Sequence, residues 1–290
     1  MSRFRFVEDH RDTYEVKRLC ELAECSRSGF YAWRDRPPCE RDVADGELLE
    51  EIRVIHAESR RTYGAPRVHG QLRRRGHRVG CKRVARLMRA EGLKGAHVRR
   101  KWRRGRPDIA PAPDLVNRRF RAARPNQLWV ADISEFPTGE GKLHVAGVRD
   151  LCHRGMVGWA MGPRPDADLV VDAVVMALGR CTPDPDGLVH HSDRGGAYTS
   201  FDFCSAVDLA GLQISFGSTG DCYDNAAMET VWSTIKREIS WIRGSIWFPT
   251  RDEARLYLFE FIEVFYNRQR HQTVLGHHTP AEFAATFASQ

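Results

Sequence analysis

The chain has 290 residues and a mass of 33.1 kDa, a length that allows about two domains. Hydrophobic residues make up 42% of it, enough for a sizeable core, and no apolar run approaches the roughly 18 residues that a membrane span needs. The first residues, MSRFRFVEDHRD, hold no apolar stretch after the arginines and do not resemble a secretory signal. These features disfavour a membrane protein, a secreted disulfide scaffold and a wholly disordered chain.

Cysteine usage points to a cytoplasmic protein. The eight cysteines form no CxxC pair and have no zinc-finger spacing with histidines. Without an export signal, this pattern predicts reduced, buried thiols.

The net charge of +7 conceals a strongly basic middle segment. Residues 51–124 carry 23 Lys and Arg against 5 Asp and Glu, a net charge of +18, whereas residues 1–50 carry −3 and residues 125–290 carry −8. A solvated face is the ordinary explanation of a short charged run, but it fits so large an excess poorly. The distribution predicts binding to a polyanion, with DNA or RNA as the first candidate.

The N-terminal segment, residues 1–45, is predicted to be helical. Apolar residues recur at helical spacing from Tyr14 to Leu22, and Ser26 is the predicted N-cap of a second short helix. Pro37-Pro38 then ends the pattern.

Residues 46–96 are predicted to form a helix-turn-helix-like DNA-binding domain of three helices. Pro66 suits the first turn of the second helix, and Gly76 fits its end. A small helical bundle with a basic surface is the alternative, but DNA contact is favoured because the charge continues into residues 97–106. The predicted DNA contacts of this domain are Arg73, Arg74, Arg75, Lys82, Arg83, Arg86 and Arg89.

A basic arm and a Pro/Ala linker follow over residues 97–124. The tract HVRRKWRRGR leads into PDIAPAPD, a composition with little capacity to pack. Such an arm can lie along phosphates, with Trp102 able to stack on a base or sugar. Its predicted DNA contacts are Arg99, Arg100, Lys101, Arg103 and Arg104.

The rest of the chain has an α/β pattern, with a predicted catalytic core over residues 125–245 and a C-terminal helical extension over residues 246–290. The order of elements is β-β-β-α-β-α-β-α-α, which predicts a mixed five-stranded sheet covered by helices. The predicted strands are Leu128–Phe136, Leu143–Val148, Met156–Met161, Leu188–His191 and Gln213–Phe216.

Three carboxylates stand out by their positions in this domain. Asp132 lies in the apolar strand LWVADISEF, Asp193 follows the short strand LVHHS, and Glu229 lies on the helix DNAAMETVWSTIKRE. A carboxylate in a buried strand is costly unless it is paired or bound to a metal. Two strand carboxylates and one from a facing helix would suit two Mg²⁺ ions, for which Mn²⁺ should substitute. Taken singly, the three residues also fit a ladder edge, a turn and a helix surface. His190 and His191 are either structural or aids to a metal-bound water.

The motifs WVADI, HHSDRGGAYTS and CYDNAAMETVWSTIKRE resemble those of the DDE transposases and retroviral-type integrases. The resemblance is to the second-frame (OrfB) protein of a large bacterial insertion-sequence family in particular. Between Asp193 and Glu229 lie 35 residues, the family's D,D-35-E spacing, and between Asp132 and Asp193 lie 60. The segments ESRRTYGAPRVHGQLRRRG and FYNRQRHQTVLGHHTPAEF resemble the family too, so the match covers roughly residues 13–285.

This resemblance implies an RNase H-like core in which Asp132, Asp193 and Glu229 are catalytic residues and metal ligands. Lys236, seven residues past Glu229 and on the same helix face, occupies the position of a basic residue that contacts terminal DNA in the family. The resemblance also implies a multimer that pairs both DNA ends, with a circular intermediate. It further assigns DNA or active-site support to Arg268, Arg270 and His271, which on physics alone are solvated surface.

Three departures from the family pattern are visible. Ala131 stands where the family often has threonine, and the zinc-binding His/His/Cys/Cys module of retroviral integrases has no counterpart. The chain also lacks a heptad stretch like that of the upstream-frame protein. We therefore expect the second-frame product alone, which would act with an upstream-frame (OrfA) protein or as a fusion with it.

The predicted function is that of an insertion-sequence DNA transposase. Metal-activated water would nick the element's 3′ ends, and the freed 3′-hydroxyl would attack a second phosphodiester in target DNA. We expect a cytoplasmic protein that associates with the nucleoid when it is bound to DNA. The alternatives are an RNase H-like metal nuclease that never joins strands, a non-enzymatic helix-turn-helix DNA-binding protein, and an inactive element.

Overall fold

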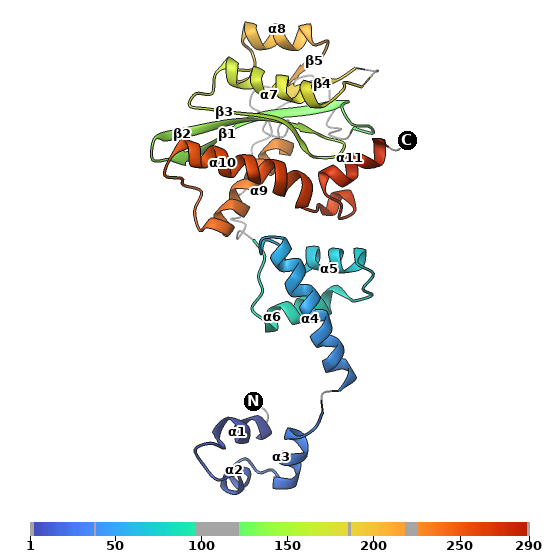
Figure 1. Ribbon diagram of the computed structural model, residues 1–290, viewed down its shortest axis with the longest axis vertical. Coiled ribbons are helices and arrows are strands. Elements are labelled where there is room, and N and C mark those ends of the chain that lie inside the picture. The colour runs from blue at the N-terminus through green and yellow to red at the C-terminus, as the bar shows by residue number, and fades with distance from the viewer. Residues whose placement is uncertain (1–2, 38, 97–121, 185–186, 218–225, 289–290) are drawn as a thin grey trace, which may run out of the picture. The chain divides into compact units, whose positions relative to one another are not determined.

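The computed structural model describes residues 3–37, 39–96, 122–184, 187–217 and 226–288 (Figure 1). The chain divides into two compact units, Met1–Glu51 and Ile52–Gln290. No helix in the described ranges is both long and apolar enough to cross a membrane.

The first unit is built on three short helices, α1 (Arg3–His10), α2 (Val16–Leu22) and α3 (Arg27–Arg34). The predicted cap of α3 is confirmed, because the Ser26 hydroxyl accepts a hydrogen bond from the Gly29 amide at 3.0 Å. Helix α1 lies in the segment predicted to be helical but before the periodic pattern that begins at Tyr14, and Val7 is its one buried residue. The buried residues of this small core are Val7, Leu19, Cys20 and Phe30.

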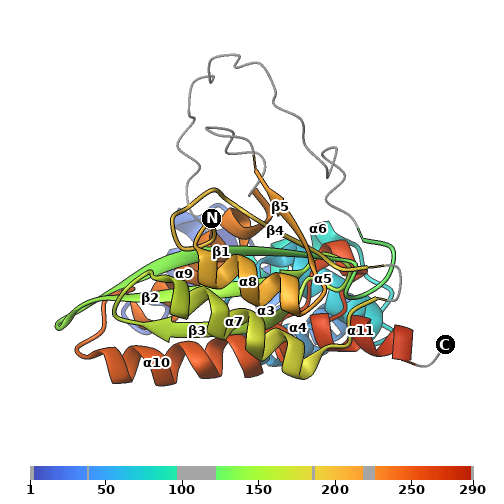
Figure 2. The same ribbon diagram turned by 90° about the horizontal axis from the view of Figure 1, so that it is seen from above.

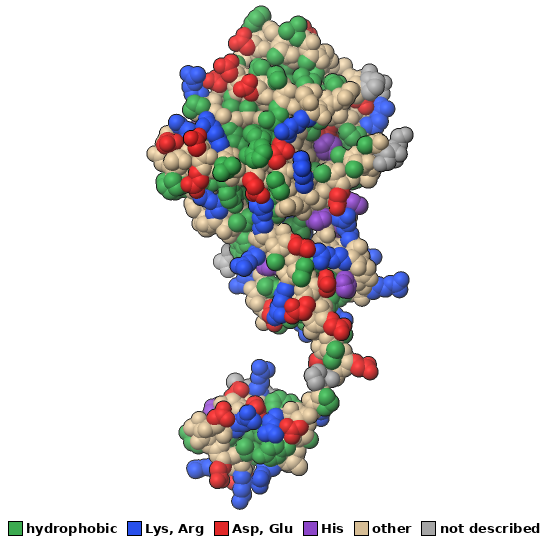
Figure 3. Space-filling model, viewed as in Figure 1, with side chains coloured by type: hydrophobic (Ala, Val, Ile, Leu, Met, Phe, Trp, Pro, Cys, Tyr) green, Lys and Arg blue, Asp and Glu red, His purple; other side chains and the backbone are tan. Residues whose placement is uncertain are grey.

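The three-helix region after it consists of α4 (Glu40–Glu58), α5 (Ala65–Arg74) and α6 (Cys81–Ala90). Pro66 lies in the first turn of α5, as predicted, and Val84, Leu87 and Met88 form the buried face of α6. Helix α4 begins six residues before the predicted domain boundary at residue 46. Figure 3 shows basic side chains over this region with acidic ones between them, which agrees with its charge.

The core is a five-stranded mixed sheet in the order β3-β2-β1-β4-β5, which confirms the predicted fold class. Strands β1, β2 and β3 form an antiparallel meander, and β4 and β5 add to β1 in parallel. Gly158 of β3 lets helix α7 approach closely, because an added Cβ would lie 2.7 Å from the side chain of Ala177. The strand bounds are β1 Leu128–Thr138, β2 Gly141–Asp150, β3 Met156–Gly162, β4 Val189–Ser192 and β5 Gln213–Phe216.

Helices cover both faces of the sheet (Figures 1 and 2). One face packs against α7 (Ala167–Arg180) and α8 (Phe201–Leu209), with Trp129 at the centre of that core. The other face packs against α9 (Ala226–Arg243) and α10 (Arg251–Glu260), with Val130 and Phe136 in contact with them. The sheet therefore separates two hydrophobic cores. Successive side chains of β1 point to opposite faces of the sheet and so enter the two cores alternately.

The C-terminal extension contains several distinct elements. Helix α10 continues into a π-helix, η1 (Phe261–Gln269), which is followed by a 3₁₀ turn, η2 (Thr273–Leu275), and a further helix, α11 (Pro280–Ala288). These elements lie within the predicted helical extension, residues 246–290, and the sequence pattern did not separate them.

The cysteines of the described ranges are free thiols, as expected. Of those described, Cys20 and Cys152 are buried, four others are partly buried, and the predicted burial is wrong for Cys39, which is exposed just before α4. Cys222 lies outside the described residues.

Candidate active site and DNA interface

The sheet register brings Asp132 and Asp193 side by side. Strands β1 and β4 are parallel neighbours, and Val130 pairs with His191. Asp132 lies within β1, two residues after Val130. Asp193 lies two residues after His191, directly after the end of β4. Because adjacent strands lie about 4.8 Å apart, two carboxylates at matching positions are close neighbours.

The electrostatics of Asp132 show that both other predicted carboxylates, Asp193 and Glu229, act on it. Burial, followed by repulsion from Asp193 and from Glu229, raises the pKa of the Asp132 carboxyl to about 7. A backbone hydrogen bond with Ile133 and the charge of Lys236 oppose this rise. Asp132 thus has the two other carboxylates and the lysine near it, and these four residues come from three separate segments of the sequence.

Helix α9 supplies both Glu229 and Lys236. Its buried face, which includes Val231, Trp232 and Ile235, packs on the sheet and fixes the helix against β1. Glu229 is exposed in the first turn, and Lys236 is half-buried two turns later, with its ammonium 5.4 Å from the centre of the Phe136 ring. Burial lowers the pKa of Lys236, whereas Glu135 and Asp132 raise it.

A tight turn orients the Asp193 carboxylate. The Gly195 amide donates a hydrogen bond to Asp193 Oδ1 at 3.0 Å, and a Cβ on Gly195 would also lie 3.0 Å from that oxygen. The side chain is otherwise exposed, so its remaining lone pairs face solvent. The turn therefore holds the carboxylate in one direction and leaves it free to bind a cation.

The donor set suits a hard divalent cation. Carboxylate oxygens are the ligands that Mg²⁺ and Mn²⁺ take in proteins, and like-charge repulsion at Asp132 is relieved when a cation binds. Across the described ranges, however, no three His, Cys, Asp or Glu side chains already enclose a metal position. Ligation by all three carboxylates thus requires a local adjustment of their side chains.

Three buried polar side chains, His190, His191 and Tyr198, lie close to Asp193 in sequence. The pKa of His190 is lowered to about 4 by its full burial and by His191, so this imidazole is neutral and structural. His191 bonds through Nδ1 to the Ser215 hydroxyl at 2.9 Å, a structural contact as well. Sequence reasoning missed Tyr198, whose buried hydroxyl has no hydrogen-bond partner in the described part of the chain. Burial, together with Asp132 and Asp193, raises its pKa. Its place five residues after Asp193 in GGAYTS was the available signal.

The predicted DNA-binding residues of the three-helix region divide into exposed and paired side chains. Arg74 forms an ion pair with Glu282 of α11 at 3.1 Å and donates to the His277 carbonyl at 2.8 Å. Arg75 pairs with Glu58, and Arg83 is half-buried. Arg73, Lys82, Arg86 and Arg89 are exposed. The predicted arm contacts, Arg99 to Arg104, lie outside the described residues.

The C-terminal trio of predicted DNA contacts is placed differently from expectation. Arg268 is exposed, whereas Arg270 is buried and bonds to Glu238 of α9 through two hydrogen bonds of 2.8 Å. This position argues against direct DNA contact by Arg270, because its donors are satisfied away from solvent. His271 is half-buried, and its backbone amide donates to the Tyr63 hydroxyl at 2.6 Å.

Ion pairs also join the three-helix region to helices α9 and α10. Arg67 of α5 lies 3.3 Å from Glu238, and Arg60 forms a bidentate pair with Glu260 of α10. Gly70 of α5 packs directly against the His277 ring, where a side chain would collide. Sequence patterns did not reveal this interface, since each contact joins residues far apart in the chain.

Comparisons with known proteins agree with this architecture. Residues 44–102 match the HTH-like domain family, and residues 122–222 and 229–286 match two integrase core domain families. The fold and the site thus define a protein with a helix-turn-helix-like domain ahead of an integrase core.

Full-length relatives identify the family. The chain is 34% identical to transposase InsF of insertion sequence IS3A from Escherichia coli K12, over 97% of this chain and 98% of that protein. It is 40% identical to the IS600 uncharacterized 31 kDa protein of Shigella sonnei, over 91% and 97% of the two chains. The IS904 transposase of Lactococcus lactis is 36% identical, over 86% and 97%. The chain belongs to the insertion-sequence transposases of the IS3 type, which are enzymes of the DDE transposase and integrase class, as predicted.

Among solved structures, the catalytic core domain of HTLV-2 integrase in complex with magnesium is similar with a TM-score of 0.44 and 14% identity. The similar region is 57% of this chain and 99% of that one.

Proposed function

We propose that this transposase nicks the 3′ ends of its insertion element and then transfers those ends into a second DNA molecule. The observation that supports this most directly is the electrostatic effect of Asp193 and Glu229 on Asp132, both of which lie close enough to raise its pKa. Asp132 and Asp193 each stand two residues past the paired positions Val130 and His191 of β1 and β4. Such a carboxylate group is suited to phosphodiester chemistry and offers no protein nucleophile, so the attacking group comes from water or DNA.

The two steps share one chemistry. In nicking, water attacks the phosphorus, the bond to the element's 3′-oxygen breaks, and that oxygen leaves with a proton. In transfer, the freed 3′-hydroxyl attacks a target phosphorus and displaces another 3′-oxygen. Two Mg²⁺ ions, or Mn²⁺ in their place, would supply positive charge beside the attacking and leaving oxygens.

The residues of the chain would divide this work between the sheet and one helix. Asp132 and Asp193 would hold the cations from the sheet, with the Gly195 amide keeping Asp193 oriented. Glu229 would complete the ligand set from α9, and Lys236 would hold a DNA phosphate on the same helix face. Arg73, Lys82, Arg86 and Arg89, which are exposed, would bind the element ends.

The DNA partners follow from the same assignment. We propose that the chain binds element-end and target DNA as a homo-oligomer, with the upstream-frame protein as a further partner. Because phosphate contacts release counterions, the affinity for end DNA should fall steeply with salt. The basic arm, residues 97–124, is proposed to add to this binding through its sequence charge.

Strand joining on labelled element-end DNA with Mg²⁺ or Mn²⁺ tests the proposal. Wild-type protein should give nicked and joined products, and both should disappear in Asp193→Asn and Glu229→Gln. Asp252→Asn is the matched control, because Asp252 is exposed in the first turn of α10, far from the carboxylate site in sequence, and should leave both products intact.

Each other outcome has a separate meaning. Nicking without joining, still dependent on Asp193, would support a nuclease and contradict transfer. If no protein gives a product, the reaction is repeated with the upstream-frame protein present. Products that survive in Asp193→Asn would remove the carboxylate mechanism altogether.

A further inference from the structure

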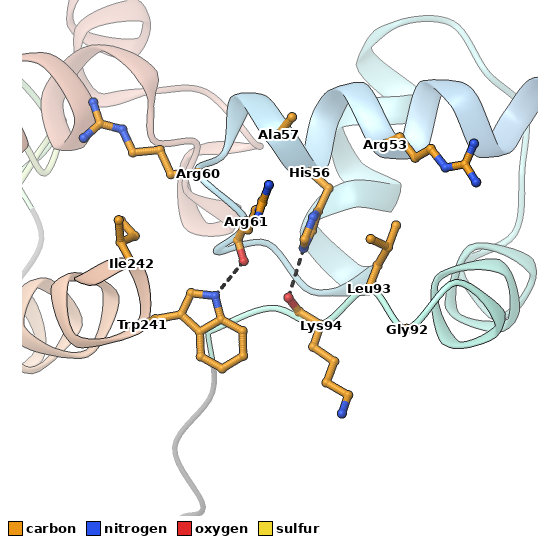
Figure 4. A pocket seen from close by; sticks show the side chains of 10 residues that line it. All are labelled: Arg53, His56, Ala57, Arg60, Arg61, Gly92, Leu93, Lys94, Trp241 and Ile242. Carbon is orange, nitrogen blue, oxygen red and sulfur yellow. Dashed lines mark hydrogen bonds between the residues drawn. The ribbon is translucent and has the colours of Figure 1, made fainter. Parts of the chain in front are cut away.

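A cleft of about 950 Å³ lies between the three-helix region and the end of helix α9, outside the carboxylate site (Figure 4). Its walls come from the end of α4 and the turn after it, from the segment that follows α6, and from the last turn of α9. The residues that matter for its chemistry are Arg53, His56, Arg60, Arg61, Lys94 and Trp241.

The cleft is strongly cationic. Arg53 pairs with Glu91 at 2.6 Å, and Arg60 pairs with Glu260, so these two arginines are neutralised and stabilise the walls. Arg61 and Lys94 are exposed, and neither forms an ion pair with any residue of the described ranges. Arg61 and Lys94 therefore both line the cleft as cations that have no ion-pair partner in the described part of the chain.

The backbone that presents Arg61 is strained. Arg60 and Arg61 both adopt the left-handed region, with φ of 54° and 61°, which bulky L residues rarely enter. The Arg61 amide donates to the His56 carbonyl at 2.8 Å, and the Trp241 indole donates to the Arg61 carbonyl at 2.9 Å. Strain that is held in place by surrounding contacts is typical of functional sites.

Trp241 gives the cleft an aromatic wall. Its indole nitrogen is anchored to the turn, yet 39% of the residue is exposed, and Figure 4 shows the ring beside Arg61 and Lys94. His56 bonds to the Lys94 carbonyl at 3.0 Å and fixes the opposite wall. An exposed aromatic ring next to unpaired cations is the combination that binds single-stranded nucleic acid.

We propose that this cleft binds a single-stranded segment of DNA, with Arg61 and Lys94 on phosphates and Trp241 stacked on an unpaired base. The inference rests on the proposed function in that DNA is the substrate. A duplex base has neighbours on both faces, so only an unpaired base can offer a face to Trp241.

The position of the cleft along α9 fits this role. Trp241 follows Glu229 by 12 residues on the same helix, a separation of about 18 Å at 1.5 Å per residue. That is roughly five nucleotide steps of 3.4 Å along a strand. The basic arm also begins in sequence three residues after Lys94. The cleft would therefore hold a DNA strand a few nucleotides away from the reacting phosphate.

Salt-dependent binding of the full chain to oligothymidylate tests the phosphate contacts. Each lost contact to a single strand should reduce the slope of log affinity against log salt by about 0.7. For Arg61→Gln combined with Lys94→Gln we expect a slope smaller by about 1.4, and at 0.1 M salt an affinity roughly 25-fold weaker. Glutamine, like arginine and lysine, is an L residue with an unbranched side chain, so the substitutions add no new backbone strain at these positions. Circular dichroism checks that the double variant is folded. The control Arg255→Gln with Arg164→Gln removes two exposed charges elsewhere and should change affinity by less than about threefold.

Photocrosslinking to 5-iodouracil oligonucleotides tests the stacking contact. Trypsin separates residues 238–243, which contain Trp241, from residues 244–251, which contain the comparably exposed Trp247. We expect the crosslink on the first peptide and not on the second. Trp241→Leu should weaken binding at least about fivefold, whereas Trp241→Phe, which keeps a ring, and Trp247→Leu should bind nearly as well as wild type.

Several results would overturn the inference. These are an unchanged salt slope in the double variant, a crosslink absent from residues 238–243, or a loss confined to duplex DNA. These binding readouts need no catalysis. If wild-type protein joins strands while the cleft variants bind oligothymidylate normally, the cleft assignment fails and the transposase function stands. If wild-type protein fails to join strands but the crosslink is found at Trp241, the cleft assignment stands and the proposed strand-transfer function fails.

Discussion

Glu238 of helix α9 accepts two hydrogen bonds of 2.8 Å from the buried Arg270 side chain, and the same carboxylate lies 3.3 Å from Arg67 of α5. Glu238 stands nine residues after Glu229 on one helix. The helix that carries the candidate ligand Glu229 is thus joined to the three-helix region by the contact between Glu238 and Arg67.

Removal of one partner of this pair should be severely destabilising. Glu238→Ala leaves Arg270 as a buried, unpaired cation, and the expected loss in free energy of unfolding is about 3–5 kcal/mol, measured by urea denaturation. The apolar double variant Glu238→Met with Arg270→Met should recover most of that loss, because no charge is left buried. A double variant as unstable as the single one would show that the charges themselves are required.

The pH dependence of this pair has a definite sign. Burial alone would raise the pKa of Glu238, but Arg270 outweighs it and the pKa is lowered. The stabilisation is therefore present above the unfolded pKa near 4.5 and is lost as the pH falls through the lower folded value. Acid unfolding of wild type, compared with the double methionine variant, should show this loss only in wild type.

Two buried tyrosines should respond oppositely to loss of the hydroxyl. The Tyr63 hydroxyl accepts a hydrogen bond from the His271 amide at 2.6 Å, whereas the Tyr198 hydroxyl has no partner in the described part of the chain. We expect Tyr63→Phe to lower the free energy of unfolding by about 1–3 kcal/mol, since a buried amide is left unsatisfied. Tyr198→Phe should raise it by about 1 kcal/mol in urea unfolding with EDTA present. A destabilised Tyr198→Phe would mean that its hydroxyl is bonded in solution.

Because the pKa of Asp132 is raised, we expect the free energy of unfolding to fall as the pH rises when divalent cations are absent. The pKa of Asp132 is raised to about 7 from an ordinary 3.8, so the folded protein holds this proton more tightly than the unfolded chain. The penalty begins near pH 4, grows to about pH 7 and stays constant above it, at no more than about 4 kcal/mol.

Urea unfolding in EDTA at about pH 5 and pH 8 measures this penalty as a difference between proteins. The free energy of unfolding of Asp132→Asn should rise relative to that of wild type between pH 5 and pH 8, because the asparagine amide carries no charge at either pH. Asp252→Asn, an exposed aspartate, should keep the wild-type pH profile. Addition of Mg²⁺ or Mn²⁺ at pH 8 should stabilise wild type and not Asp132→Asn. Parallel profiles for wild type and Asp132→Asn would contradict a raised pKa.

The sheet could be predicted well because its strands leave local signals, and the same signals marked Asp132 and Asp193 as candidate neighbours. Strand periodicity located β1 and β4, and their parallel register then places Asp132 beside Asp193 without further information. The capping hydroxyl of Ser26 was equally visible, since its partner Gly29 is three residues away. Local chemistry of this kind can be inferred from a single chain.

The interface between the three-helix region and α9 was not predictable in this way. Arg67 and Glu238 are separated by 171 residues, and nothing in either segment marks the other as its partner. Arg270 therefore read as solvated surface or a DNA contact, although it is buried. The cleft beside Trp241 was missed for the same reason, because its walls come from three distant segments. Charge and periodicity identify a basic region but cannot tell which arginines are already paired.

Gly195 and Gly196, which follow Asp193 in the turn, allow a matched test of whether the close contact with Gly195 positions the Asp193 carboxylate. An alanine Cβ at Gly195 would lie 3.0 Å from Asp193 Oδ1 and would push the carboxylate away from its position, whereas a Cβ at Gly196 would meet nothing within 4 Å. We expect Gly195→Ala to lower the rate of metal-dependent nicking by roughly tenfold or more, because small displacements of catalytic groups are costly. Gly196→Ala should stay within about twofold of wild type, and neither variant should change the free energy of unfolding by more than about 0.5 kcal/mol, since both sites are near the surface. Equal activity of the two variants in the nicking assay would show that the orientation of Asp193 by the Gly195 turn does not limit catalysis.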